Sequence, residues 1–427
     1  MISPAISVSV SLPDDTNFNV ARGHSIIEHG LPADPDTRFN VGSVAKQITA
    51  HLVIDAARQR KIDLTAPART FLPRLVVDDV TVADLITHTS GIRDTEAMLS
   101  LCGYRDLDHY TATDLLTLAY RQQRRCALPG QFLYSNTNYL LLAAILESVH
   151  DPGFDELAGS SLFKPLGMAA TAFRPDARAP IAHAASSYEA TGSGFTSGQR
   201  PVAIAGPGSL WTTPSDLLIW LRHLTSVIAP HWPARLPRAA EIAYVPCGRG
   251  HTYGPGLFAI NNQSQPAVFH NGHEHGYSAS TYLRGDNLAL ACASNADWIP
   301  ADKVMAELVR TRCTPEDVEM LVGEYITHQP REGSFEAPTA SGEPLEDLGR
   351  YHARELPGSI RLGRHPHGLS VIRRGTVDNL QPDPTRPRRF TGRGIAITLA
   401  SPGIHPPDEF VLDLDRAPGI HYLRAGG

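Results

Sequence analysis

The strongest constraint on the fold is an apolar pattern that begins at residue 44. Two neighbouring stripes of apolar side chains recur at helical spacing, and they comprise Val44, Ile48, Leu52 and Ala56, with Ala45, Val53 and Ala57 beside them. A helix that is apolar over so much of its surface is buried in a protein core. The sequence therefore predicts a buried helix over residues 44–57, with Gly42 and Ser43 at its start.

Segments with strand character precede this helix and return late in the chain. Residues 5–12 and 18–21 are joined by the turn-like spacer Pro13-Asp14-Asp15 and are predicted to form a hairpin. Later strands are expected at 253–261, 267–270, 278–283 and 287–294, followed by a helix at 301–312. The N-terminal hairpin and three of the later strands are predicted to build one antiparallel sheet.

The middle of the chain has a different period. Three-and-four spacing of apolar residues predicts helices at 82–87, 112–121, 139–149 and 215–224, separated by loops rich in Gly, Ser and Pro. The predicted fold class is therefore α/β, with an antiparallel sheet flanked by helices and an all-helical subdomain. We assign residues 1–324 to this domain, with a helical insertion at about 82–225.

The C-terminal part of the chain is predicted to fold separately. Residues 325–344 are polar and prone to turns, which is typical of a linker. Short alternating segments follow at 359–362, 368–373, 395–399, 410–414 and 420–423. This spacing of strands and turns indicates a small antiparallel β-barrel or sandwich over residues 345–427.

Charge and composition exclude several classes of partner. The chain has 427 residues and a formal net charge of −6, without a basic stripe, which argues against nucleic acid and anionic membranes as partners. No apolar run approaches the ~20 residues of a membrane-spanning helix, and the first apolar segment lacks the basic residues of a secretion signal. A cytoplasmic location is the expectation, and the five scattered cysteines are expected to be reduced thiols.

Lysine is scarce in this chain. Of 38 basic residues only four are lysine, namely Lys46, Lys61, Lys164 and Lys303. A lysine, unlike an arginine, can lose its proton and act as a base. Ser43 and Lys46 stand three residues apart on the predicted helix, so their Cβ atoms lie about 5–6 Å apart on one face and the amine can take the serine proton. Ser161 and Lys164 repeat the spacing beside Pro165, and we interpret this second copy as structural.

Two further short motifs can carry chemistry. In Tyr134-Ser135-Asn136 the tyrosine can relay protons beside a lysine, and the asparagine amide can bind a substrate amide. The alternative for this motif is a structural one, with Asn136 as a helix N-cap and Tyr134 in the core. In His270-Asn271-Gly272 the glycine lets a substrate approach a strand edge, and the histidine is expected to face the pocket.

Together, in this order, these motifs resemble those of the penicillin-recognising serine hydrolases, in the branch of class C β-lactamases, D-aminopeptidases, esterases and acyltransferases. The resemblance covers about residues 1–312, and the C-terminal segment is similar to the lipocalin-like barrel of such enzymes. Other stretches that look familial are Phe39-Asn40-Val41-Gly42-Ser43, Leu85-Ile86-Thr87-His88-Thr89-Ser90-Gly91, Pro165-Leu166-Gly167-Met168 and Gly208-Ser209-Leu210-Trp211-Thr212-Thr213.

The resemblance implies a role for each motif. Ser43 attacks the carbonyl, Lys46 and Tyr134 share the acid and base work, and the backbone N–H groups of Ser43 and His273 form the oxyanion hole. The resemblance assigns substrate binding to the side chain of Asn136, to His270 and to Gly272. His270 is expected to contribute a charge or a hydrogen bond. The family commonly has lysine where this chain has His270, so strong turnover of β-lactams is not expected.

We conclude from the sequence that the chain is a serine hydrolase that cleaves an amide or ester of a small peptide or acyl compound through an acyl-Ser43 intermediate. The alternatives are an acyltransferase that passes the acyl group to an amine or alcohol, and a non-catalytic binding protein of the same fold. No cofactor is expected. A metal site built from His270, His273, Glu274 and His275 is the less favoured interpretation, and the sequence leaves the oligomeric state open.

Overall fold

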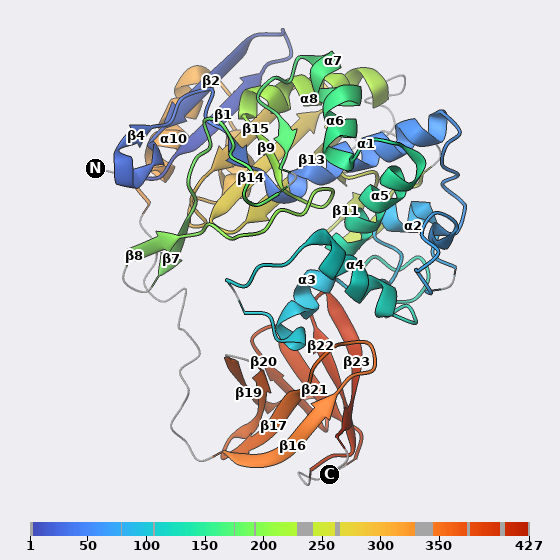
Figure 1. The fold of residues 1–427 in the computed structure, drawn as a ribbon. Coiled ribbons are helices and arrows are strands. Elements are labelled where there is room, and N and C mark those ends of the chain that lie inside the picture. The colour runs from blue at the N-terminus through green and yellow to red at the C-terminus, as the bar shows by residue number, and fades with distance from the viewer. Residues whose placement is uncertain are drawn as a thin grey trace. The chain divides into compact units, whose positions relative to one another are not determined.

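The computed structural model describes residues 3–77, 79–105, 107–174, 176–191, 194–228, 242–260, 265–328, 345–373, 376–401 and 406–425. They form two compact units (Figure 1). The first unit comprises Met1–Leu72, Thr81–Thr87 and Tyr139–Phe335, and the second comprises Pro73–Val80, His88–Asn138 and Glu336–Gly427.

The first unit is built on one antiparallel sheet. In spatial order its strands are β10 (Val245–Gly248), β11 (His251–Tyr253), β12 (Phe258–Ile260), β13 (Ala267–Glu274), β14 (Tyr277–Arg284), β15 (Ala289–Ser294), β1 (Ile6–Ser11) and β2 (Asn17–Arg22). The predicted N-terminal hairpin is confirmed as β1 and β2, and it joins the late strands because β1 pairs with β15. Residues far apart in the sequence thus share one sheet.

Helices and short strands complete the first unit. Its helices are α1 (Ala45–Arg58), α2 (Val82–Ile86), α5 (Asn136–Val149, of which 136–138 belong to the second unit), α6 (Phe154–Ala158), α7 (Lys164–Leu166), α8 (Pro214–Ile228), α9 (Ala301–Leu308) and α10 (Pro315–Tyr325). Single turns of 3-10 or π-helix are η1 (Ile27–His29), η2 (Gly42–Val44), η3 (Ala68–Thr70) and η5 (Gly159–Phe163). Short strands are β3 (His24–Ile26), β4 (Leu31–Pro32), β5 (Phe39–Asn40), β6 (Ala172–Phe173), β7 (Tyr188–Thr191), β8 (Gly194–Ser197) and β9 (Leu210–Thr212).

The alternation in β1 explains why helices cover both faces of the sheet. Ile6, Val8 and Val10 point into a core that contains buried side chains of α9 and α10. The serines between them face the other way, where Ser9 Oγ lies 3.3 Å from Ser215 Oγ of α8. Branched side chains on one face fill a core, each contributing about 1.5–3 kcal/mol on burial, and small serines on the other allow a helix to approach closely.

Helix α1 is buried as its apolar stripes predict. One of its buried polar residues, Gln47, is 2% exposed, and both ends of its amide make hydrogen bonds. Gln47 Nε2 donates to Thr281 Oγ1 of β14 at 2.7 Å, and its Oε1 accepts from Trp220 Nε1 of α8 at 2.9 Å. These bonds satisfy a buried amide and hold α1 between the sheet and α8.

Several elements of the first unit differ from the sequence-based expectation, among them two strands of the sheet and one helix. The single strand expected at 253–261 is two strands, because Gly254 N–H bonds Leu257 O at 2.9 Å in a turn where Gly256 has φ +68°; residue 261 lies outside the described residues. Strand β13 continues to Glu274 beyond the expected end at residue 270. Helix α9 ends at Leu308 rather than at residue 312.

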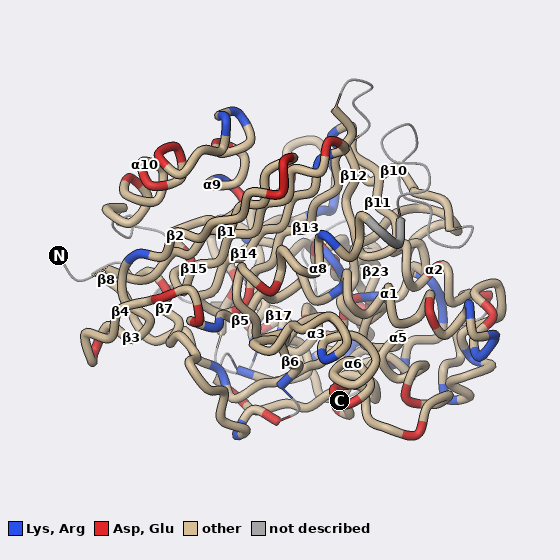
Figure 2. Tube along the Cα trace, turned by 90° about the horizontal axis from the view of Figure 1, so that it is seen from above, with Lys and Arg blue, Asp and Glu red and all other residues tan. Residues whose placement is uncertain are grey.

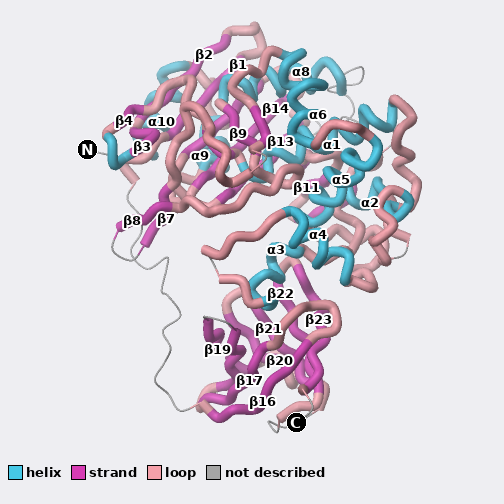
Figure 3. The backbone as a smooth tube through the Cα atoms, viewed as in Figure 1, coloured by secondary structure: helices cyan, strands magenta, loops and turns pink. Residues whose placement is uncertain are grey.

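The second unit contains a closed antiparallel barrel, in which β23 pairs back onto β16. Figure 3 shows this segment as strands and loops throughout its described residues. Its strands are β16 (Glu346–His352), β17 (Ile360–His365), β18 (Gly368–Arg373), β19 (Thr376–Pro382), β20 (Arg389–Gly392), β21 (Ile395–Leu399), β22 (Glu409–Leu414) and β23 (Ala417–Arg424). The predicted antiparallel sheet with flanking helices and the predicted C-terminal barrel are both confirmed.

The same unit holds a helical segment packed on the barrel. It contains α3 (Thr95–Met98), η4 (Leu99–Cys102) and α4 (Ala112–Arg121). Met98 and Leu101 are buried in one core with barrel residues. The sequence places residues 88–138 with the catalytic domain, whereas in the structure they form one compact unit with the barrel. Of the linker expected at 325–344, only residues 325–328 are described, at the end of α10.

Charges of both signs are interspersed along the chain. Figure 2 shows Lys and Arg positions and Asp and Glu positions scattered over the described chain, and α10 carries acidic residues in its first turn. Among the residues that the structure describes, no helix is long and apolar enough to cross a membrane.

Candidate active site

Ser43 lies in the tight turn η2, between β5 and α1. The turn depends on Gly42, which has φ +48° and lies so close to β13 that an added Cβ would be 2.6 Å from His273 O. Asn40 fixes the turn from the other side, because its Oδ1 accepts the Gly42 N–H at 3.1 Å. The sequence Asn40-Val41-Gly42-Ser43 therefore places a half-buried serine at the start of a long helix, where backbone N–H groups favour negative charge.

Lys46 is completely buried in the first turn of α1. Its Nζ lies 2.9 Å from Ser43 Oγ and 2.8 Å from Pro207 O, and 5.6 Å from the centre of the Tyr139 ring. A lysine amine held this way is oriented toward the serine hydroxyl rather than toward water. The structure thus brings together the serine and lysine that the sequence predicts as nucleophile and base.

The edge of β13 runs beside this turn. An added Cβ at Gly272 would be 1.9 Å from Val41 O and 3.2 Å from Ser43 N, so a side chain at residue 272 is excluded. The backbone of His273 lies equally close to Gly42, and its side chain is exposed. The predicted oxyanion residues, Ser43 and His273, therefore have neighbouring backbones, and Gly272 is required for that approach.

His270 is buried and neutral. Its side chain is 1% exposed, and burial, with a further contribution from the Lys46 charge, lowers the pKa of His270 to about 3. Nδ1 lies 2.7 Å from Asn271 O, which can only accept, so Nδ1 carries the proton. Nε2 is then an acceptor, 3.4 Å from Tyr253 Oη. Of the two roles expected for His270, a charge or a hydrogen bond, the lowered pKa favours the hydrogen bond.

Tyr134 and Asn136 lie in the second unit, at the end of a loop and the start of α5. The Tyr134 ring is 4.3 Å from the ring of His88, centre to centre. The Asn136 backbone N–H bonds Asp94 Oδ2 at 3.1 Å, and its Nδ2 bonds Glu96 Oε2 at 2.5 Å. Ser135, which lies between Tyr134 and Asn136, is held by His88. This histidine is fully buried with φ +58°, and its Nδ1 accepts the Ser135 N–H at 3.3 Å.

The barrel supports this motif through residues that the sequence analysis missed. Asp94 is fully buried, and its Oδ2 also pairs with Arg416 Nη1 of the barrel at 2.8 Å. Arg93, 2% exposed, donates to Pro418 O at 2.7 Å and to Gly419 O at 2.9 Å. Asp94 before Thr95 could have been read as an N-cap. Its barrel partners, more than 300 residues later in the chain, leave no local signal.

The histidines near His270 are the candidate ligands of the less favoured metal interpretation. His270 and His273 are three residues apart on β13, so their side chains lie on opposite faces of the strand. Within the described ranges, no three His, Cys, Asp or Glu side chains gather as metal ligands.

The second Ser-x-x-Lys copy has a different environment. Ser161 and Lys164 lie in η5 and α7, and both are exposed. The residues between them, Leu162 and Phe163, are buried instead. The local pattern alone therefore does not build a site.

Comparisons with known proteins agree with this geometry. The protein-family model described as Beta-lactamase matches residues 3–311. A D-aminopeptidase of Cereibacter sphaeroides is 25% identical over 267 residues, covering 62% of this chain and 51% of that protein. A teichoic acid D-alanine hydrolase of Staphylococcus aureus is 26% identical over 216 residues, covering 49% and 52%. The chain thus spans about half the length of these relatives.

Among solved structures, the octameric penicillin-binding protein homologue from Pyrococcus abyssi has a similar fold. It aligns with a TM-score of 0.62 and 21% sequence identity, over 99% of this chain and 96% of that one. The alignment therefore includes the C-terminal barrel as well as the sheet domain.

Proposed function

Because the chain belongs to the beta-lactamase family, we propose that it is a serine acyl hydrolase that cleaves an amide or ester of a small peptide or acyl compound. One observation carries the proposal: the fully buried Lys46 holds its Nζ 2.9 Å from Ser43 Oγ. A surface lysine three residues from a serine would be hydrated and mobile. Here the amine is fixed where it can take the hydroxyl proton.

The reaction proceeds in two steps. Ser43 Oγ attacks the substrate carbonyl carbon while its proton passes to Lys46, and the proton then goes to the leaving amine or alcohol as the acyl bond breaks. Water next attacks the acyl-Ser43 ester, giving the free acid and restoring the hydroxyl. The family resemblance assigns Tyr134 a share of the proton transfer and Asn136 the orientation of the acyl group, and both roles are part of the proposal.

The oxyanion of each step would be held by the N–H groups of Ser43 and His273. Support comes from the two glycines that let these backbones approach, Gly42 and Gly272. Neutral His270 fits a hydrogen-bonding role, and the absence of a cation at this position disfavours acyl substrates with a free carboxylate there.

The names of the relatives favour an acyl group derived from a D-amino acid. One is a D-aminopeptidase and the other a teichoic acid D-alanine hydrolase, so a D-alanyl amide or ester is the substrate to try first. A preference of the D over the L form of one amide, measured as kcat/KM, would support this part of the proposal.

A nitrophenyl ester tests the proposal. We expect a burst of one nitrophenolate per active chain, followed by slower turnover, and no burst from Ser43→Ala. Binding of the ester without a burst would favour the non-catalytic alternative. Added amines that divert the acyl group into an amide product would indicate acyl transfer instead of hydrolysis, because the acyl-enzyme is common to both.

A further inference from the structure

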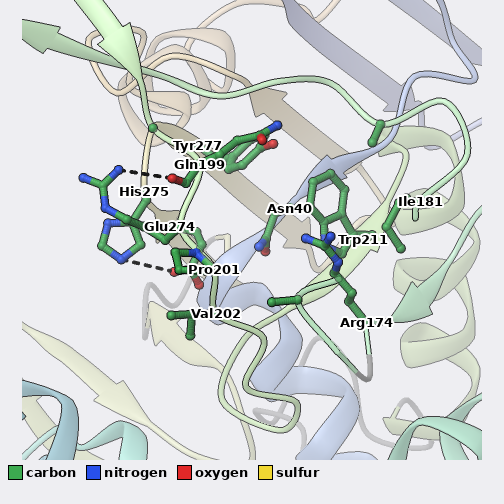
Figure 4. Close-up of a pocket in the computed structure, with 14 residues that line it drawn as sticks. Asn40, Arg174, Ile181, Gln199, Pro201, Val202, Trp211, Glu274, His275 and Tyr277 are labelled. Atoms are coloured by element: carbon green, nitrogen blue, oxygen red, sulfur yellow. Dashed lines mark hydrogen bonds and ion pairs between the residues drawn. The ribbon is translucent and has the colours of Figure 1, made fainter. Parts of the chain in front are cut away.

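A pocket of about 410 Å³ lies in the first unit, and its end nearest β13 contains a carboxylate that the mechanism above does not use. Its lining includes Asn40, Arg174, Trp211, Glu274, His275 and Tyr277. Figure 4 shows Glu274 and His275 at one end, Arg174 with Trp211 and Ile181 at the other, and Asn40 between them.

The Glu274 end of the pocket borders the nucleophile turn. Asn40 lines the pocket and also accepts the Gly42 N–H. Gly208 lies between the two places, because an added Cβ there would be 3.2 Å from Glu274 Oε2 and 4.0 Å from the Gly42 carbonyl carbon. The Glu274 carboxylate therefore lies close to the turn that holds Ser43.

The pleat of β13 points Glu274 toward the same side as the catalytic pair. Pairing between β13 and β14 runs without a register shift from residue 267 to residue 274, so His270, Gly272 and Glu274 share one face. Gly272 identifies that face, because a Cβ there would be 3.2 Å from Ser43 N. Glu274 thus stands two residues beyond Gly272 on the face that Ser43 occupies.

The charges around Glu274 leave its carboxylate available to a ligand. Glu189 is paired with Arg200 at 2.7 Å, and His275 Nδ1 lies 3.6 Å from Glu189. The contact of Glu274 with His275 Nε2 is longer, 4.0 Å, and 32% of the Glu274 side chain stays exposed. Burial of the carboxylate raises the pKa of Glu274, and the charges of His275 and Lys46 offset this shift only in part.

We propose that Glu274 binds an ammonium group on the acyl part of the substrate, so that the preferred substrates are amides or esters of amino acids with a free amine. An ammonium beside the scissile carbonyl would form a charge-assisted hydrogen bond with the carboxylate. The guanidinium of Arg174, 5.9 Å from the Trp211 ring centre and bonded to Ala179 O at 2.9 Å, belongs to the far end of the pocket. This inference rests on the proposed acyl-Ser43 hydrolase.

The test uses two nitroanilides of equal size. Alanine nitroanilide carries the ammonium, and 2-methylpropanoic acid nitroanilide replaces it with a methyl group. At pH 7 we expect the ratio of their kcat/KM values to favour the amine in the parent protein. Because the ammonium also activates the carbonyl, the informative quantity is the change of this ratio in Glu274→Gln, where we expect a fall of about 10- to 100-fold.

Two variants control the test. Glu319→Gln removes the same charge from a half-exposed pair with Arg22 and should leave the ratio within about twofold. Glu274→Asp keeps the charge and should retain part of the preference even if Glu274→Gln folds poorly.

An unchanged ratio in Glu274→Gln, with both compounds still hydrolysed through Ser43, would overturn the role of Glu274 and leave the proposed function standing. No turnover of either compound by the parent, and no acyl group on Ser43, would overturn both.

Discussion

The chain contains the same four-residue pattern twice, and only one copy has the geometry of a catalytic pair. In Ser43-Val44-Ala45-Lys46, Val44 and Ala45 are buried together with the lysine, whose amine lies against the serine hydroxyl. In the second copy, Leu162 and Phe163 take the core side of the helix, and the serine and lysine face water. Both copies thus have a serine and a lysine three residues apart, and the two copies differ in how deeply these side chains are buried.

The comparison shows what the surrounding structure adds to a short motif. Around the first copy, Pro207 O holds the amine, and two glycines let β13 approach the serine backbone. Around the second, Gly159 has no heavy atom within 4 Å of an added Cβ apart from its own helix backbone and chain neighbours. A nucleophile needs neighbours that remove water and fix its base, and these come from distant parts of the chain.

Removing the two serines gives the largest contrast. Ser43→Ala should lower kcat by at least about 10³-fold, because it removes the atom that forms the acyl bond. Ser161→Ala should leave kcat within about twofold. Both proteins should unfold at the parent's urea midpoint within error, which separates loss of chemistry from loss of fold. Equal activity in Ser43→Ala and the parent would contradict the comparison.

The two lysines give the next contrast. Lys46→Arg should lose about 10²- to 10⁴-fold in kcat/KM, nearly as much as Lys46→Ala, because arginine remains protonated and cannot act as a base. Lys164→Arg and Lys164→Ala should match the parent. If Lys46→Arg retained most of its activity, Lys46 would act only by its charge, and the proton pathway would need another base.

The glycines beside each copy extend the comparison to the backbone. Gly42→Ala puts a methyl group 2.6 Å from His273 O at positive φ, so the oxyanion residues must separate, and we expect kcat to fall roughly 10²-fold. In Gly159→Ala the added methyl group would have no clash, and residue 159 is already helical. This substitution should therefore stabilise the fold by about 0.5–1 kcal/mol without changing kcat. Circular dichroism checks that Gly42→Ala is folded; full activity there would show that this approach is not needed.

The smallest effect is a dependence of stability on pH. His270 has a pKa of about 3 in the folded chain, below the ordinary value of 6.5. Between these values the unfolded chain binds the proton and the folded chain does not, so His270 lowers stability as pH falls from 6.5 toward 3. Replacing it in His270→Asn should therefore reduce the loss of unfolding free energy between pH 7 and pH 5. Urea titrations at both pH values measure this, and an equal loss in the two proteins would argue that His270 is protonated when folded.

Much of the fold follows from local patterns. The alternation in residues 6–11 identifies a strand and both of its faces, and the stripes from Val44 identify α1. The alternating pattern does not identify β19 and β20, because both strands carry many polar residues. A barrel strand directs only every second side chain into the core, so these sequences show little hydrophobic signal. The turn at Gly254–Leu257 does not stand out in the sequence, because the apolar residues on both sides of it look like one continuous strand.

The site was only partly accessible to sequence reasoning. Ser43, Lys46 and Gly272 could be named from their motifs, because each motif is short and contiguous. Pro207 could not be assigned, because it acts through a backbone carbonyl, which leaves no signal in the sequence. Glu274 could not be assigned either, because the histidines beside it suggested a metal site instead. The neutrality of His270 depends on burial by β12 and on the Lys46 charge, which only the folded chain brings together.

The most direct measurement is the position of the covalent acyl group. The protein is mixed with an activated aminoacyl ester, quenched in acid during the burst, digested and mapped by mass spectrometry. We predict one acyl group per chain on the peptide that contains Ser43, unchanged in Ser161→Ala and absent from Ser43→Ala. An acyl group on Ser161, or one that persists in Ser43→Ala, would contradict the assignment of Ser43 as the nucleophile.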